Sequence, residues 1–192
     1  LQVALALDYP EFTVWLLDDM GRPELRQLAG QLGCRYQARN KHAHAKAGNL
    51  NAALPLLQGE LVAVLDADVV PQRSFLMRTV SLLEQDSGAA LVQTPQSYMN
   101  ADPVLRNLQL ERWLLPDEEA FYRWVEPVRQ GVGAVVCAGT SFVVRRRALL
   151  AVGGFETGTP SEDLATGIRL AAAGWRLHFL AEKLSAGLAP HS

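Results

Sequence analysis

The sequence has little of several features that mark particular classes of protein. Two of its 192 residues are cysteine, Cys34 and Cys137. Two are too few for a disulfide scaffold, so we expect both to be reduced. No apolar run approaches the roughly 20 residues that cross a bilayer, and the run 61–65 ends at Asp66. No Lys or Arg precedes the apolar opening residues, so no signal peptide is indicated. With 18 Lys and Arg against 20 Asp and Glu, no basic excess points to a nucleic-acid partner.

The chain is instead an ordinary globular sequence, 49% hydrophobic, in which apolar and amphipathic segments alternate. The segments expected to be strands are 12–17, 61–65, 89–94, 134–145 and 176–181. The segments expected to be helices are 23–33, 46–57, 74–85, 102–126 with a break at Pro116, and 161–173. This alternation predicts an α/β fold over residues 1–192, with a mixed, mostly parallel sheet flanked by helices. The residues before Leu7 are typical of the end of a helix, so we expect the chain to be part of a longer protein.

Acidic residues follow the expected strands, at the edge where such folds place their chemistry. Asp66 and Asp68 come directly after the run 61–65. On extended backbone, side chains two residues apart point the same way, and two neighbouring carboxylates favour a shared cation. Mg²⁺ or Mn²⁺ is held by one or two carboxylates together with substrate phosphates. The alternative is a solvated turn after a strand, since short motifs often match by chance.

Two further acidic pairs have both a functional and a structural interpretation. Asp18 and Asp19 follow another expected strand and could hydrogen-bond to a base or ribose, although turn chemistry alone accounts for them. Glu162 and Asp163 open an expected helix, where acids favour the helix dipole and Ser161 is a candidate cap. The functional interpretation makes Asp163 a general base for an acceptor hydroxyl.

One segment narrows these alternatives, because a ten-residue pattern matches by chance far less often than a D-x-D pair. The run His42-Ala-His-Ala-Lys46-Ala-Gly-Asn49-Leu-Asn51 lies between two of the expected strands. It resembles the H-A-K-A-G-N-L-N signature of the processive glycosyltransferases of family 2. Among these it is most similar to the catalytic subunits of bacterial cellulose synthases.

Further motifs agree with this resemblance in order and spacing. They are the acidic motif 14–19, the D-x-D motif 66–68, the Q-T-P segment 92–96, the C-A-G-T-S loop 137–141 and the S-E-D motif 161–163. The resemblance covers residues 1 to 190 and implies a GT-A-like, Rossmann-like catalytic domain, truncated at both ends, whose first strand would precede Leu1.

On the donor side, the resemblance implies a UDP-sugar held with Mg²⁺ or Mn²⁺. Asp66 and Asp68 would bind the metal and UDP and take part in catalysis. Lys46 would approach the phosphates. The remaining nucleotide-binding residues would be Asp18 and Asp19 at the uridine, and His44 and Asn49 in the loop around Lys46.

On the acceptor side, the resemblance implies a glucan whose terminal hydroxyl is deprotonated by Asp163. The acceptor end would be lined by Cys137, Gly139, Thr140 and Glu162. Sugar transfer would then invert the configuration at the anomeric carbon. The sequence departs from the family pattern at Met20, at Val69 and at Ala138, and the last two lie nearer the acceptor.

The resemblance also implies a setting for the domain. The family's enzymes are embedded in the bacterial inner membrane through further segments, face the cytoplasm and work with a partner subunit. Because those segments and the Q-x-x-R-W motif lie outside residues 1–192, we expect this chain alone to bind nucleotide weakly and to make no polymer. Three alternatives stay open: a related synthase of hyaluronan, chitin or mannan type, a non-catalytic nucleotide-binding or interaction domain, and a phosphatase-like domain with aspartate nucleophiles.

Overall fold

The computed structural model describes residues 1–39 and 43–188, so His42 of the signature segment lies outside the described residues. The strands are β1 (Trp15–Asp18), β2 (Arg35–Ala38), β3 (Leu61–Val64), β4 (Val70–Pro71), β5 (Ala89–Gln93), β6 (Phe142–Arg145), β7 (Arg176–Phe179) and β8 (Ser185–Ala186). The α-helices are α1 (Gln2–Leu5), α2 (Pro23–Gln31), α3 (Ala45–Ala53), α4 (Phe75–Gln85), α5 (Pro103–Asn107), α6 (Asp117–Ala120), α7 (Glu126–Gly131), α8 (Arg146–Ala151) and α9 (Glu162–Ala172). A 3₁₀ turn, η1 (Leu54–Leu56), and a π-helical turn, η2 (Phe121–Val125), complete the described elements.

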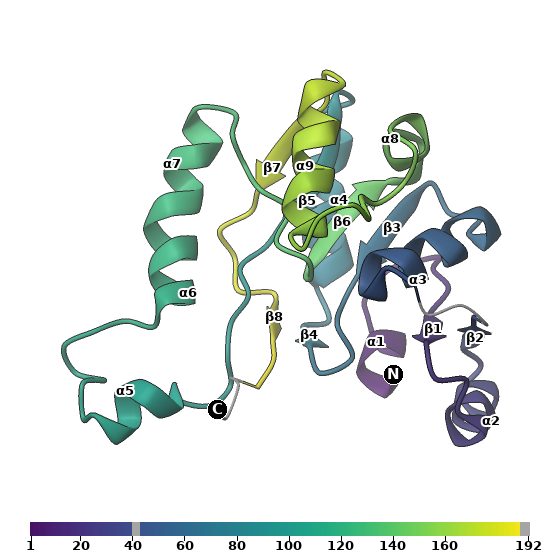
Figure 1. The fold of residues 1–192 in the computed structure, drawn as a ribbon, viewed down its shortest axis with the longest axis horizontal. Coiled ribbons are helices and arrows are strands. Elements are labelled where there is room, and N and C mark those ends of the chain that lie inside the picture. The colour runs from purple at the N-terminus through teal and green to yellow at the C-terminus, as the bar shows by residue number, and fades with distance from the viewer. Residues whose placement is uncertain (40–42, 189–192) are drawn as a thin grey trace.

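The central sheet has the strand order β3-β6-β5-β7. The strand β6 is antiparallel to both β3 and β5, whereas β5 and β7 are parallel. Three of its strands therefore run in one direction and β6 runs against them, which confirms the predicted mixed, mostly parallel sheet. A second parallel pair, β1-β2, lies beside it (Figure 1). The additional first strand implied by the resemblance stays a prediction.

Helices cover both faces of the central sheet, because its buried side chains alternate between two apolar clusters. One cluster joins Leu91 and Val144 to the helices α3, α8 and α9. The other joins Val92 and Val143 to α4. In Figure 1, α9 lies in front of the sheet and α4 behind it. The carboxyl ends of β3 and β5 and the loop that leads into β6 meet between these layers.

Helices α2, α4 and α9 lie where the sequence predicts them, whereas two long predicted elements are confirmed only in part. In the segment 102–126 the predicted break at Pro116 is confirmed, since α6 begins at Asp117, but residues 108–115 before it are not an α-helix, because α5 ends at Asn107. Within 134–145, only Phe142–Arg145 is a strand. Side chains from other elements take up hydrogen bonds of residues 138–141, so this segment needs no neighbouring strand.

The segment from α5 to α7 extends away from the sheet on the left of Figure 1. It carries Trp113 and Trp124, whose exposed fractions are 82% and 57%, so neither belongs to the core. Among the described residues, no helix combines the length and the hydropathy that a membrane crossing requires.

Candidate functional site

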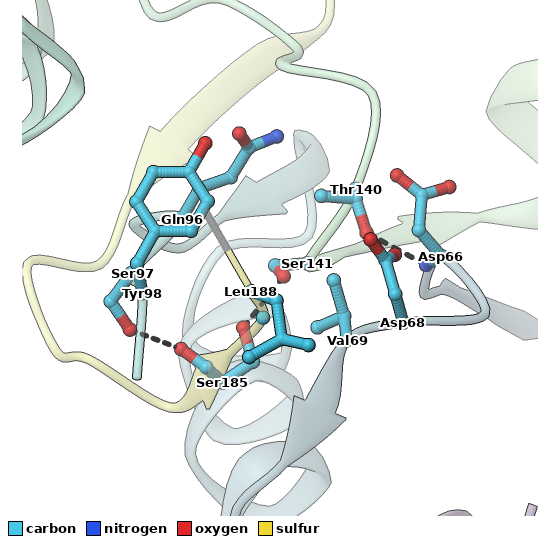
Figure 2. Close-up of a pocket in the computed structure, with 11 residues that line it drawn as sticks. Asp66, Asp68, Val69, Gln96, Ser97, Tyr98, Thr140, Ser141, Ser185 and Leu188 are labelled. Carbon is cyan, nitrogen blue, oxygen red and sulfur yellow. Dashed lines mark hydrogen bonds between the residues drawn. The ribbon is translucent and has the colours of Figure 1, made fainter. Parts of the chain in front are cut away.

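The D-x-D carboxylates lie in a turn at the end of β3. The strand ends at Val64, and the amide of Val69 donates to the carbonyl of Asp66 at 3.1 Å. The prediction that Asp66 and Asp68 lie on extended backbone is therefore wrong. The turn nevertheless directs both carboxylates to the same side, as Figure 2 shows. Both side chains remain accessible for a ligand.

Lys46 links this turn to the loop before β6. Its Nζ donates to the Asp66 carboxylate and to the carbonyl of Gly139, the latter at 2.6 Å. The backbone amide of Asp66 donates to the Thr140 hydroxyl at 2.9 Å (Figure 2). Lys46 lies in the first turn of α3, whereas Asp66 and Gly139 lie 20 and 93 positions further along the chain. The structure therefore brings together three segments that the sequence predicted to act as one site.

Asp163 lies across the cleft from Asp66, in the first turn of α9. A cleft of about 270 Å³ is lined by the predicted residues Lys46, Asp66, Cys137, Gly139, Glu162 and Asp163, together with apolar side chains. A Cβ atom added to Gly139 would lie 2.9 Å from Oδ2 of Asp163, so the loop approaches this carboxylate as closely as glycine permits. Ser161 occupies the N-cap position without a side-chain capping bond, so the predicted cap is wrong.

A second hollow of about 160 Å³ opens on the other side of Asp66. Figure 2 shows its lining of carboxylates, hydroxyls and one aromatic ring. The named members are Asp66, Asp68, Val69, Gln96, Ser97, Tyr98, Thr140, Ser141, Ser185, Gly187 and Leu188. Asp66 lines both cavities, so its carboxylate lies between the Asp163 cleft and this polar hollow, whereas Asp68 lines the polar hollow alone.

Asp18 is 1% exposed and is held by its neighbours. Its carboxylate accepts hydrogen bonds from the Arg22 guanidinium, the Tyr36 hydroxyl and the backbone amides of Met20 and Arg22. Burial alone would raise the pKa of Asp18, but these hydrogen bonds, led by that of Arg22, hold the pKa well below its usual range. Asp18 thus ties β1 to β2 and to the start of α2, while its predicted uridine contact stays a prediction.

Replacing Asp18 with asparagine is expected to lower the free energy of unfolding by about 2–3 kcal/mol, because charge-assisted buried hydrogen bonds are lost. A carboxylate with a depressed folded-state pKa stabilises the fold above its unfolded pKa of about 3.9, and this contribution disappears as the pH falls below that value. Urea unfolding of the chain at a series of pH values measures both effects. The variant should show a smaller loss of stability in acid than the unmodified chain, and an equal loss would contradict this role.

Asp19 faces the signature segment through Arg39. The guanidinium of Arg39 pairs with both carboxylate oxygens of Asp19, at 2.5 and 2.7 Å. The same guanidinium donates to the carbonyls of Ala43 and Ala45, beside the left-handed residue His44 at φ 64°. Arg39 therefore links Asp19 to the backbone on either side of the exposed His44, and neither Asp19 nor His44 lines either cavity. Arg39 was not predicted as a site residue, since nothing in its local sequence separates it from other surface arginines.

Asn49 and Cys137 both have buried side-chain atoms. Within residues 1–39 and 43–188, the side-chain oxygen of Asn49 is buried without a hydrogen-bond partner. Cys137 is 2% exposed, and burial raises the pKa of its thiol to about 12, so the thiol stays protonated and is unsuited to act as a nucleophile. Both Cys34 and Cys137 are free thiols, as predicted.

A divalent cation fits this site only in company with substrate oxygens. Among the described residues, no group of three or more His, Cys, Asp and Glu side chains converges. Asp66 and Asp68 are two carboxylates on one side of an open turn, which suits an ion that completes its shell with phosphate and water. Lys46 would have to share or release Asp66 when such an ion binds, because it pairs with the same carboxylate.

Comparison with known proteins identifies the family. The family profile described as "Glycosyltransferase like family 2" matches residues 1–191. The chain belongs to glycosyltransferase family 2. It is 37% identical over 188 residues to "Cellulose synthase 1 catalytic subunit [UDP-forming]" of Komagataeibacter xylinus, covering 97% of this chain and 25% of the relative. It is 38% identical over 191 residues to "Cellulose synthase catalytic subunit [UDP-forming]" of Xanthomonas axonopodis pv. citri, covering 98% of this chain and 26% of the relative.

Solved structures of other proteins share the fold. A mannosyltransferase, PcManGT of Pyrobaculum calidifontis, in complex with GDP-Man and Mn²⁺, superposes with a TM-score of 0.70 at 22% identity and covers 99% of this chain and 52% of its own. S. aureus TarS 1–349 in complex with UDP-GlcNAc gives 0.69 at 13% identity, over 100% of this chain and 54% of its own. The predicted GT-A-like fold is confirmed. The chain spans between 12% and 26% of the length of its curated relatives.

Proposed function

We propose that the chain is part of the catalytic domain of a longer, processive glycosyltransferase that transfers glucose from UDP-glucose to a growing β-1,4-glucan with inversion at the anomeric carbon. The observation that carries the proposal is the convergence of Lys46, Asp66, Gly139 and Asp163 on one cleft. The curated relatives at 36–38% identity carry the name cellulose synthase, and several are named UDP-forming. The setting we propose is the cytoplasmic face of a bacterial inner membrane, with a partner subunit and a glucan acceptor.

The residues of the cleft divide the chemistry of transfer between them. Asp163 accepts the proton of the attacking acceptor hydroxyl, which makes that oxygen a better nucleophile. Lys46, freed from Asp66, pairs with the phosphates of the donor and stabilises the charge that develops on UDP. Mg²⁺ or Mn²⁺, when held by Asp66 and Asp68, would supply further charge neutralisation for the departing diphosphate. Asp18, Asp19, His44 and Asn49 would shape the nucleotide side, and Cys137, Gly139, Thr140 and Glu162 the acceptor side.

The proposal predicts that UDP binding depends on Mn²⁺ and on the D-x-D carboxylates. In the complete gene product, replacing Asp66 or Asp68 with alanine is expected to weaken UDP affinity at least about tenfold, since a direct charge contact is lost. Isothermal titration calorimetry with UDP, in Mn²⁺ and in EDTA, measures the effect. Asp8→Ala removes an exposed carboxylate paired with Arg73, away from the cleft, and should bind as the unmodified protein does.

Three outcomes separate this function from its alternatives. A UDP affinity that is the same in both D-x-D variants as in the unmodified protein would favour a non-catalytic nucleotide-binding or interaction domain. Phosphate release from simple phosphate esters would favour a phosphatase-like domain. Transfer of a sugar other than glucose, measured as product from a panel of UDP-sugars together with GDP-mannose, would assign the chain to a synthase of hyaluronan, chitin or mannan type. Robust polymer synthesis by residues 1–192 alone would contradict the expectation that further segments are required.

A further inference from the structure

The loop 138–141 lies between the D-x-D turn at Asp66 and the start of α9 at Asp163, and it contacts both. Its backbone takes left-handed conformations at Gly139, with φ 82°, and at Ser141, with φ 58°. It presents the Gly139 carbonyl to Lys46 and the Thr140 hydroxyl to the Asp66 amide. A non-glycine residue such as Ser141 adopts positive φ at a cost and keeps it where its surroundings impose it. Something outside the loop must therefore hold it in shape.

The side chain of Gln93, at the end of β5, fixes the loop through hydrogen bonds to its backbone. It is completely buried. Its Oε1 accepts from the amide of Ala138 at 2.9 Å, and its Nε2 donates to the carbonyl of Thr140 at 2.8 Å. The same Nε2 lies 2.8 Å from the carbonyl of Thr94 and 3.4 Å from that of Ser141. One amide thus satisfies both ends of the loop, and its acceptor and donor groups are used by backbone rather than left for a ligand.

Neighbouring residues of the same segment complete the attachment. The backbone amide and the hydroxyl of Thr94 donate to the Ser141 carbonyl at 3.0 and 2.8 Å. Gln96 donates to the Ala138 carbonyl at 2.8 Å from the loop's outer side. Gln96 lies in the wall of the polar hollow, whereas Gln93 lines neither cavity. Gln93 can therefore influence the site only through the loop that it holds.

We infer that Gln93 is a positioning residue for sugar transfer, acting through loop 138–141 to set the distance between Asp66 and Asp163. The inference rests on the proposed function, because it assigns the residue to that reaction. Without the Gln93 amide, Ala138 N–H and the Thr140 carbonyl lose their buried partners and the loop relaxes. The Gly139 carbonyl then moves relative to Lys46, and the close approach between Gly139 and Asp163 is lost. A misplacement of about 1 Å in reacting groups can cost about a hundredfold in rate.

The test compares two substitutions of Gln93 with a structural control in the complete gene product. Gln93→Leu keeps the approximate volume and removes all the loop contacts, so kcat for glucose transfer should fall at least about thirtyfold while KM for UDP-glucose changes less than about threefold. Gln93→Glu keeps the acceptor oxygen and, as a neutral buried acid, one donor. At about pH 6 the kcat of Gln93→Glu should stay within about threefold of that of the unmodified enzyme. At about pH 9 the ratio of the two kcat values should fall further, because the acid ionises and loses its donor.

Arg145→Met is the matched control. Arg145 is also buried, lies at the opposite end of β6, and donates to the carbonyls of Ala89 and Leu83 at 2.9 and 2.6 Å. Its loss should lower the melting temperature and leave kcat of the folded enzyme unchanged. Hydrogen exchange at the Ala138 amide supplies a readout that needs no substrate. Exchange should be at least about tenfold faster in Gln93→Leu and unchanged in Arg145→Met, because only the first variant removes the acceptor.

The outcomes are distinct. Unchanged kcat or unchanged Ala138 exchange in Gln93→Leu overturns the inference, as does an equal loss of kcat in Arg145→Met. If Gln93→Leu does not fold, the pH dependence of Gln93→Glu relative to the unmodified enzyme decides, and a pH-independent ratio overturns it. If instead Asp66→Ala leaves transfer intact, the proposed function fails, while Ala138 exchange still reports whether Gln93 holds the loop.

Discussion

Replacing Asp163 with asparagine is expected to lower the rate of sugar transfer by about 10²–10⁴-fold, the range over which general bases contribute. Asparagine has nearly the same shape, so the first turn of α9 and the walls of the cleft should be preserved. It cannot accept the proton of the acceptor hydroxyl. UDP affinity should change little, because the donor-side charges are Lys46, Asp66 and Asp68. Initial rates of UDP release with UDP-glucose and a cello-oligosaccharide, together with UDP titration, separate the two effects.

A matched control tests the competing interpretation of Asp163 as an acid that favours the helix dipole. Asp117 also lies in the first turn of a helix, α6, and it is exposed and remote from the cleft. Asp117→Asn should therefore reproduce any effect of removing a first-turn charge, at about 0.3–1 kcal/mol of stability, without changing kcat. Equal rates for Asp163→Asn and the unmodified enzyme would remove the general base from the proposed mechanism.

Substituting Gly139 with alanine is expected to lower the rate of sugar transfer more than about a hundredfold, since the added methyl group would displace the carboxylate of Asp163, the proposed general base. The new Cβ would lie 2.9 Å from Oδ2 of Asp163, at a residue whose φ is 82°. Either Asp163 rotates away or the loop shifts, and the Gly139 carbonyl then leaves Lys46. The kcat of Gly139→Ala, measured beside its free energy of unfolding in urea, gives the result.

The substitution Gly174→Ala is a control that has the backbone strain of Gly139→Ala without its contact with Asp163. Gly174 follows α9 with φ 87°, and a Cβ there would meet nothing within 4 Å. Both substitutions carry the same left-handed penalty, about 1 kcal/mol. Gly174→Ala should lower the free energy of unfolding by that amount and leave kcat unchanged, whereas Gly139→Ala should lower both the free energy of unfolding and kcat. Similar kcat values for the two variants would show that the close contact with Asp163 is unimportant.

Part of the site could be predicted from the sequence because it consists of short, ordered motifs. The D-x-D pair, the segment around Lys46 and the acid pair at Glu162–Asp163 each have a local pattern, and their order matches one family. Helices α2, α4 and α9 were predictable for a similar reason, since apolar periodicity and terminal Pro or Gly are local signals.

Other features depend on partners far away in the chain. The 134–141 segment is apolar enough to predict a strand, yet Gln93 and Gln96 satisfy its backbone from more than 40 positions away. Asp18 looks like a ligand residue in the sequence, but Tyr36 and Arg22 surround its carboxylate. Arg39 has no local signal at all.

The sequence by itself therefore determined the family and the α/β alternation, and it indicated the side chains that we propose for the site. The tertiary structure alone decided which carboxylates are open to a ligand and which are already bound within the fold, and how close Asp163 lies to the loop at Gly139. The physical reason is that residue type and periodicity report on local backbone and burial. Hydrogen-bond partners and contact distances, in contrast, arise where β3, β5, α3 and α9 meet in space.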